Sequence, residues 1–138
     1  MPAPKAESAA ARKPSPAPAG DPRWQGFWRL ADPKISITSA VCMLIGAATA
    51  ATVGELNWSS LALLGASLFC MEVAKNAWGD VIDIDSGNDL AVAEDDRTDF
   101  SGGKRVLVDG LLNHQQTWLI AGITGGLGLA GGAMIVLL

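Results

Sequence analysis

The fold of this chain is decided at residues 35–53, which read ISITSAVCMLIGAATAATV and contain no charged side chain. Residues 56–71 are also uncharged, and residues 115–138 are uncharged and become apolar and glycine-rich from Trp118 onward. A helix needs about 20 mostly apolar residues to cross a bilayer. We therefore expect an all-α, multi-pass membrane protein with transmembrane helices at about 35–54, 57–75 and 117–138. The second span is the least regular, because Glu72 lies near its end.

The basic residues predict the orientation of these spans. The link between the first two spans, residues 54–57, contains Glu55 and no Lys or Arg. All the basic residues therefore fall on one side: Lys5, Arg12, Lys13, Arg23, Arg29 and Lys34 before the first span, and Lys75, Arg97, Lys104 and Arg105 between the second and third. Basic residues mark the cytoplasmic side. We expect an integral membrane protein, in the plasma membrane if bacterial, with the N-terminus and the acidic 76–114 loop in the cytoplasm.

The segment before the first span divides into two parts. Residues 1–22 are rich in Pro and Ala, so we expect a disordered tail, and they lack the apolar region of a secretory signal. Trp24, Phe27 and Trp28 follow, flanked by Arg23 and Arg29. This pattern is typical of an interfacial helix and equally of an aromatic belt before a span. Asp32 and Pro33 then predict an N-cap and a first helical position.

Two features inside the apolar stretches predict packing rather than chemistry. Cys42 and Cys70 are expected to be buried thiols without a disulfide. Small residues recur every four positions, which allows close helix approach in lipid. They are Gly46, Ala50 and Gly54 in the first span, and Gly122, Gly126 and Ala130, with Gly128 and Gly132, in the third.

A cluster of polar residues lies where the second apolar stretch ends. Asn76, Asp80 and Asp83 are spaced so that they share one face if the helix continues. Oxygen ligands of this kind suit a hard divalent cation, although a solvated acidic cluster is the commoner explanation on composition alone. Asp83, Asp85, Asp89 and Glu94 also match part of an EF-hand register, but position 6 is Asn88 rather than Gly, so this match is weak.

The basic part of the same loop could bind an anion. Arg97, Lys104 and Arg105 can form charge-assisted hydrogen bonds to phosphate, and the backbone around Gly102 and Gly103 can form an anion nest. Alternatively, these basic residues only set the topology. A net charge of −4 with locally concentrated acids gives no reason to expect a nucleic-acid partner.

Three segments in this order resemble the UbiA family of membrane-bound aromatic prenyltransferases. They are Asn76-x-Trp78-x-Asp80, then residues 96–105 with the sequence DRTDFSGGKR, then Asp109-Gly110-Leu111-Leu112. Residues 29–34, RLADPK, are similar to the lead-in to the family's first helix. The resemblance covers roughly residues 24–138, so we expect residues 23–138 to form the N-terminal part of a prenyltransferase domain of the quinone-biosynthesis type, acting on dihydroxynaphthoate or hydroxybenzoate.

The resemblance implies a magnesium-dependent transferase. Asn76, Asp80 and Asp83 would bind Mg²⁺, which would bridge the phosphate oxygens of a polyprenyl diphosphate. Arg97, Lys104, Arg105, Gly102 and Gly103 would bind the departing diphosphate, and an aromatic acceptor would attack the resulting allylic cation. No residue of this chain is assigned as a covalent or acid–base catalyst.

The chain departs from the family pattern in two ways. Ala77 stands where the family usually has an acid, and Ile84 stands at the last acidic position, between Asp83 and Asp85. Family members also have about nine transmembrane helices and a second acidic motif, so we expect this chain to be inactive alone and to need a C-terminal half or a second chain. The alternative is a small non-catalytic integral membrane protein with a cation-binding cytoplasmic loop.

Overall fold

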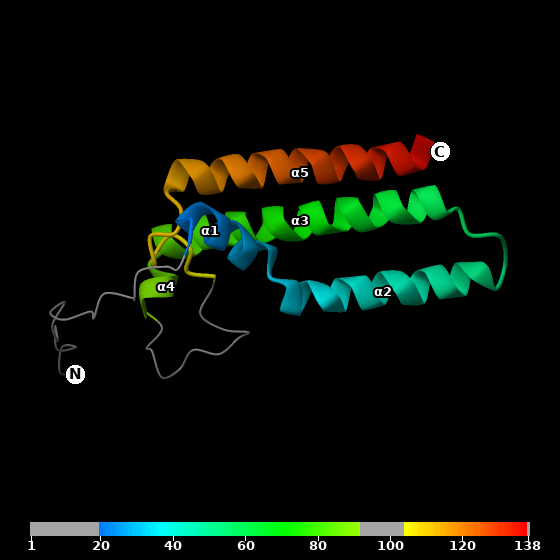
Figure 1. Ribbon diagram of the computed structural model, residues 1–138, viewed down its shortest axis with the longest axis horizontal. Coiled ribbons are helices and arrows are strands. Elements are labelled where there is room, and N and C mark those ends of the chain that lie inside the picture. The colour runs from blue at the N-terminus through cyan, green and yellow to red at the C-terminus, as the bar shows by residue number, and fades with distance from the viewer. Residues whose placement is uncertain (1–19, 92–103, 138) are drawn as a thin grey trace, which may run out of the picture.

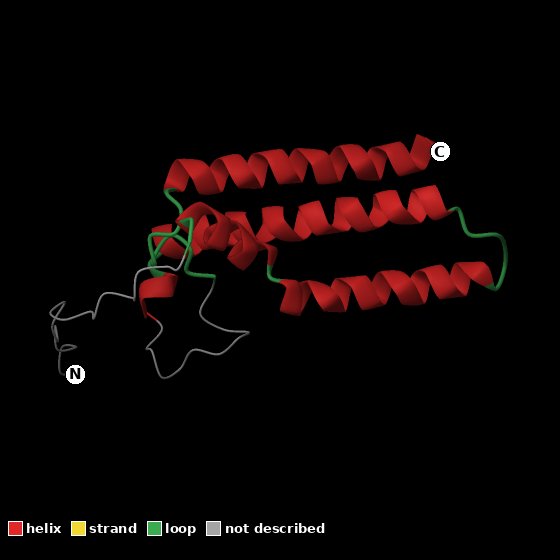
Figure 2. Cartoon of the chain, in the orientation of Figure 1, coloured by secondary structure: helices red, strands yellow, loops and turns green. Residues whose placement is uncertain are grey.

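The computed structural model describes residues 20–91 and 104–137, and within these ranges all regular structure is helical (Figures 1 and 2). The expected all-α fold is confirmed. The helices are α1 (Pro22–Ala31), α2 (Pro33–Ala51), α3 (Trp58–Asp85), α4 (Asn88–Ala91) and α5 (His114–Leu137).

The three long helices lie side by side, with α3 between α2 and α5 (Figure 1). Helix α3 packs most extensively against α5 and much less against α1 and α2. Helices α1 and α4 lie at the end of the bundle where α3 ends and α5 begins (Figure 1). The candidate polar site is at this end, so the short elements determine its shape.

Side-chain caps set where most of these helices begin. Asp21 accepts a hydrogen bond from the Arg23 amide (2.9 Å), and Pro22 occupies the first turn of α1. Asn57 caps α3 in the same way through the Ser60 amide (3.0 Å). At α5, Asn113 and Gln116 exchange side-chain-to-backbone bonds of 2.9 and 3.0 Å, which form a reciprocal capping box. These polar residues satisfy amides that would otherwise lack partners.

Asp32 departs from its predicted role. It precedes α2 as expected, but its side chain makes no capping bond and its backbone is left-handed (φ 38°). Because a residue before proline is disfavoured in the α conformation, the helix breaks here, and α1 is bent by 44° from the Ser36–Ala51 part of α2. The Asp32 carboxylate instead pairs with Lys104.

Helix α3 extends well past the expected membrane boundary at residue 75 and continues to Asp85. The first ten residues of the predicted 76–114 loop are therefore helical. Because Asp83 and Asp85 lie in this helix, the EF-hand loop register is wrong. Residues 1–19 of the predicted disordered tail lie outside the described residues.

The bundle buries its apolar side chains mainly at the end where α1 lies. Val73 and Ala77 of α3 pack there with Leu30, Val106 and Leu112, all at most 6% exposed. Large apolar side chains elsewhere on the long helices are exposed, among them Ile37, Val41, Leu44, Leu64, Ile123, Leu127 and Leu129. Cys42 and Cys70 are free thiols, but neither is fully buried as predicted, since Cys42 is exposed and Cys70 is half-buried.

One described helix, α5, is by itself long and apolar enough to cross a membrane. Helix α1 and the Ser36–Ala51 part of α2 reach that length and composition only as a bent pair. This gives weak support for membrane association, and the three expected spans remain a proposal.

Glycines bring α5 close to α3, but only at some of the predicted positions. A Cβ atom added to Gly128 would lie 2.7 Å from Met71 Cγ and 3.1 Å from the Ser67 carbonyl oxygen. Gly122, Gly126 and Gly132 have no such neighbour within 4 Å, and neither do Gly46 and Gly54. Of the described glycines in the predicted pattern, only Gly128 therefore lies in close contact with a neighbouring helix.

Replacing Gly128 with valine should destabilise the bundle, because the added atoms collide with Ser67 and Met71 of α3. We expect Gly128→Val to lower the free energy of unfolding in detergent micelles by about 1–3 kcal/mol. Gly126→Val is the matched control, since it makes the same change in helix propensity at a site without neighbours. Equal losses for the two variants would contradict this packing.

Candidate functional site

The candidate site centres on Asp80, which lies near the C-terminal end of α3 and is 2% exposed. Its Oδ1 accepts a hydrogen bond from the Val106 amide (3.1 Å), and its Oδ2 accepts one from the Leu107 amide (3.0 Å). Both carboxylate oxygens therefore hold the backbone that follows Arg105. Asp80 attaches the returning loop to α3.

The segment held by Asp80 is a single tight turn. The Asp109 amide donates to the Arg105 carbonyl (2.9 Å), and the Leu111 amide donates to the Val106 carbonyl (3.0 Å). Arg105 itself has a left-handed backbone (φ 53°), which is uncommon for a residue with a side chain. Asp80 thus caps this turn from a distant helix, as an N-cap residue does within its own helix.

Burial raises the pKa of the Asp80 carboxyl, because removal from water disfavours the charged form. The hydrogen bonds from the Leu107 and Val106 amides oppose this effect, and the nearby Asp83 adds to it. The carboxylate is thus a costly buried charge whose hydrogen bonds only partly offset the loss of water.

The other two predicted metal ligands also have partners. Asn76 Nδ2 donates to the Leu30 carbonyl (2.6 Å), which connects the last turn of α1 to α3. Asp83 is half-buried, and its Oδ1 accepts from Asn88 Nδ2 (3.3 Å). Asn76 and Asp80 therefore both point to the side of α3 covered by α1 and the 105–111 turn.

Lys104 and Arg105, which were predicted to bind phosphate, lie at the start of this turn and already pair with other residues of the chain. Lys104 pairs with Asp32, and Arg105 Nη1 donates to the Asp89 carbonyl (2.7 Å). Arg105 Nη2 is also 3.9 Å from Asp109 Oδ1. Arg97, Gly102 and Gly103 lie outside the described residues.

Three residues of this cluster were not predicted to belong to the site. Arg29 Nη1 is 2.6 Å from Asp109 Oδ2, so α1 is linked to the turn as well as to α3. Asp32 and Asp109 each neutralise a basic residue that is far away in sequence. All three occur in the segments that carry the family resemblance, and no sequence pattern assigned them to this site.

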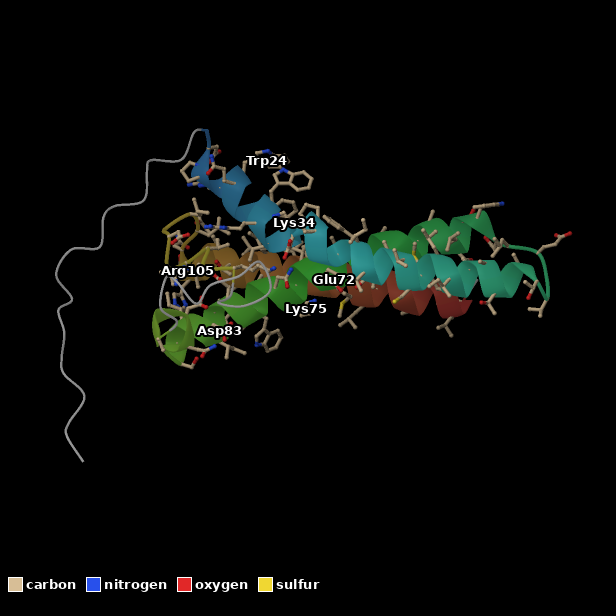
Figure 3. All side chains as sticks on the ribbon, turned by 90° about the horizontal axis from the view of Figure 1, so that it is seen from below. Trp24, Lys34, Glu72, Lys75, Asp83 and Arg105 are labelled. Atoms are coloured by element: carbon tan, nitrogen blue, oxygen red, sulfur yellow. The ribbon has the colours of Figure 1, made fainter. Side chains whose placement is uncertain are left out.

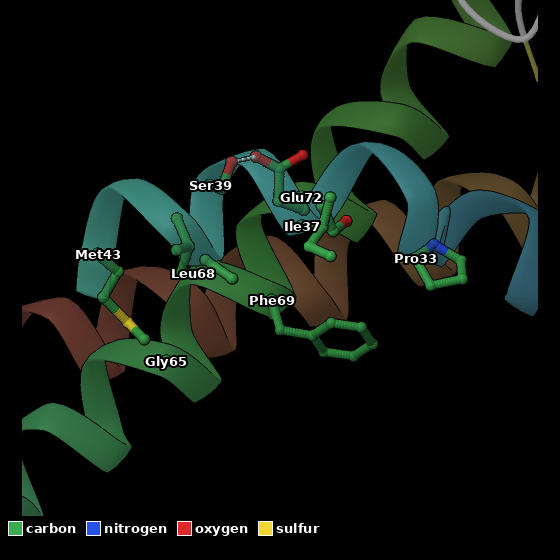
Figure 4. Close-up of a pocket in the computed structure, with 10 residues that line it drawn as sticks. Pro33, Ile37, Ser39, Met43, Gly65, Leu68, Phe69 and Glu72 are labelled. Carbon is green, nitrogen blue, oxygen red and sulfur yellow. Dashed lines mark hydrogen bonds between the residues drawn. The ribbon is translucent and has the colours of Figure 1, made fainter. Parts of the chain in front are cut away.

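A second polar group lies between α2 and α3. Glu72 accepts from Ser39 Oγ (2.7 Å) and from Lys75 Nζ (2.6 Å). It borders a groove of about 280 Å³ that is lined mainly by apolar residues, including Ile37, Met43 and Phe69 (Figure 4). Figure 3 shows Glu72 and Lys75 on the middle part of α3, away from Asp83 and Arg105.

Carboxylate, thiolate and imidazole ligands are not clustered in the described part of the chain. Within residues 20–91 and 104–137, no three His, Cys, Asp or Glu side chains are grouped so as to hold a metal ion. The amide oxygen of Asn76 is a further potential ligand in addition to these side chains. The site therefore offers isolated oxygen ligands rather than a cluster of them. Each carboxylate oxygen of Asp80 already accepts one hydrogen bond.

No family model, curated protein or solved structure matches this chain.

Removing the Asp80 carboxylate should release the 105–111 turn. The Asp80→Ala variant leaves the buried Val106 amide and the half-buried Leu107 amide without acceptors, so we expect the free energy of unfolding to fall by about 2–4 kcal/mol. Hydrogen exchange at the Val106 and Leu107 amides should accelerate at the same time. Unfolding in micelles and exchange mass spectrometry measure the two effects.

The matched control is Asp83→Ala, one turn further along α3. Its single side-chain contact at 3.3 Å is with Asn88, so the loss of stability should stay within about 0.5 kcal/mol. If both variants lost stability equally, Asp80 would not be the anchor of the turn.

Proposed function

We propose that this chain forms the N-terminal, diphosphate-binding part of a membrane-bound prenyltransferase of the UbiA type. One observation carries the proposal: the polar end of α3, with Asn76, Asp80 and Asp83, lies next to Lys104 and Arg105 from the returning loop. Oxygen donors and cations together are what recognition of a metal-bound diphosphate requires. In the chains it resembles, this combination serves transfer of a prenyl group from a polyprenyl diphosphate to an aromatic acceptor.

The residues of the site divide into potential metal ligands and residues that position the turn. Mg²⁺ in proteins commonly takes one or two carboxylates and completes its shell with phosphate oxygens and waters. Asp83 and the Asn76 amide oxygen fit this role, and a bound magnesium ion would neutralise diphosphate charge. Asp80 has lone pairs left but is buried, so its main role is to position the turn that carries Arg105.

The membrane setting is part of the same proposal. Three spans at about 35–54, 57–75 and 117–138 would place the exposed apolar side chains of α2, α3 and α5 in lipid. The Lys and Arg residues that the structure describes lie at or near the end of that region where α1 lies, which supports a cytoplasmic site and N-terminus. An isoprenoid substrate would then reach the site from within the bilayer.

A second candidate function is supported by the pairing of the cations. Asp32 and Asp109 already neutralise Lys104 and Arg29, and Arg105 bonds to a backbone carbonyl. If these basic side chains serve only to hold the 105–111 turn, the chain would be a non-catalytic integral membrane protein. Binding of a divalent metal ion would then be limited to its acidic loop.

Binding of a non-hydrolysable prenyl diphosphate analogue to the chain in lipid vesicles distinguishes the two candidates. For the transferase part, we expect binding that requires Mg²⁺ and weakens about tenfold in Asp83→Ala. The exposed neighbour Asp85 provides the control, since Asp85→Ala should leave binding unchanged. Analogue binding that persists in EDTA would contradict the proposal, and Mg²⁺ binding without analogue binding would favour the second candidate.

A further inference from the structure

Helix α1 has two apolar faces, and the protein covers only one of them. Leu30 and Ala31 are fully buried against the core, and a Cβ atom on Gly26 would lie 2.7 Å from Leu112 Cγ. On the outside, Trp24 and Trp28 remain 61% and 45% exposed. Figure 3 shows Trp24 on the outer side of α1. A helix that needs only one apolar face to pack has a second one available for another partner.

The outer face is an ordered aromatic cluster rather than scattered side chains. Trp24 and Trp28 meet edge to face with ring centroids 5.4 Å apart. Phe27, which is half-buried against the core, supports both rings from below at centroid distances of 6.0 and 5.9 Å. The basic residues Arg23 and Arg29 flank the cluster, and α1 contains no acidic residue between its caps. Aromatic rings beside positive charge complement the boundary between acyl chains and anionic headgroups.

A second exposed aromatic pair lies at the same level of the bundle. Trp78 and Trp118 are 54% and 45% exposed, and their ring centroids are 5.5 Å apart. The bond from Asn76 to the Leu30 carbonyl brings the end of α1 level with this part of α3. We call Trp24, Phe27, Trp28, Trp78 and Trp118 the aromatic rim.

The remaining tryptophan lies at the other end of α3. Trp58 is the first residue of this helix and is 71% exposed. With a rise of about 1.5 Å per residue, Trp58 and Trp78 are separated by about 30 Å along the helix axis. This equals the usual thickness of the hydrocarbon core of a bilayer, about 30 Å.

We propose that the aromatic rim binds the headgroup boundary on one side of an anionic lipid bilayer and that Trp58 marks the opposite boundary. The proposal rests on the membrane location given above and deepens it by fixing the depth of each element. Helix α1 then lies at the membrane surface rather than within a span. Lys75 lies one turn inside Trp78, and its ammonium group pairs with Glu72 (2.6 Å), so the charge nearest to this boundary on the inner side is neutralised.

Depth-dependent fluorescence quenching tests this assignment. The full chain, in vesicles of phosphatidylcholine and phosphatidylglycerol, would carry one tryptophan at a time, with the other four changed to phenylalanine. Lipids brominated at shallow or deep acyl positions serve as quenchers. We expect the variants retaining Trp24, Trp28, Trp58, Trp78 or Trp118 to be quenched about twofold or more strongly by the shallow label than by the deep label.

The control is Phe69→Trp in a background without other tryptophans. Phe69 is 41% exposed and lies about midway between Trp58 and Trp78, so its quenching should be strongest with the deep label. Deep quenching of Trp78 or Trp24 while the control behaves as expected would overturn the assigned depth and leave the membrane location intact. If neither label quenches the control, the spans themselves are wrong and the inference fails with them.

Discussion

The rest of the structured polar end depends on one buried carboxylate. Asp80 accepts hydrogen bonds from two amides that lie 26 and 27 residues further along the chain. This places Val106 in the core beside Val73 and Ala77, and it places Arg105 next to α4. Because buried amides without acceptors are costly, the turn and the end of α3 hold each other in place. Helix α1 is then held against both, through Asn76 and Asp109.

The ion pairs around this anchor have a consequence for ligand binding. Lys104, Arg29 and Arg105 neutralise carboxylates or bond to a carbonyl of the same chain, so an incoming diphosphate would have to compete with Asp32 and Asp109 for them. A doubly anionic group that brings its own cation can do so, because the metal offsets the repulsion from the acidic residues. The same pairs hold the 105–111 turn against α1 and α4. They therefore serve stability directly and would serve binding only through exchange of partners.

Burial is unequal along the bundle. The end that contains Asp80 has a compact core and a dense set of hydrogen bonds, whereas the opposite halves of α2, α3 and α5 expose Leu, Ile and Val side chains. In water this surface would be unfavourable, since burying apolar area is the main favourable term in folding. In a bilayer the lipid covers it, and the close approach of Gly128 to α3 supplies packing that does not depend on water. The distribution of exposure thus agrees with a chain that folds partly in lipid and partly at its surface.

The sequence alone determined the helical class and the approximate positions of the long helices, because these depend on local composition. It also placed Asn76 and Asp80 on one face of a helix. It did not reveal that α3 continues to Asp85, because polar residues at a membrane boundary suggest a loop whether or not the helix goes on. The partners of Asp32, Asp80 and Lys104 were decided only by the tertiary structure. Each of them lies more than 20 residues away in the chain, and no local pattern records which distant amide or carboxylate will fill a buried position.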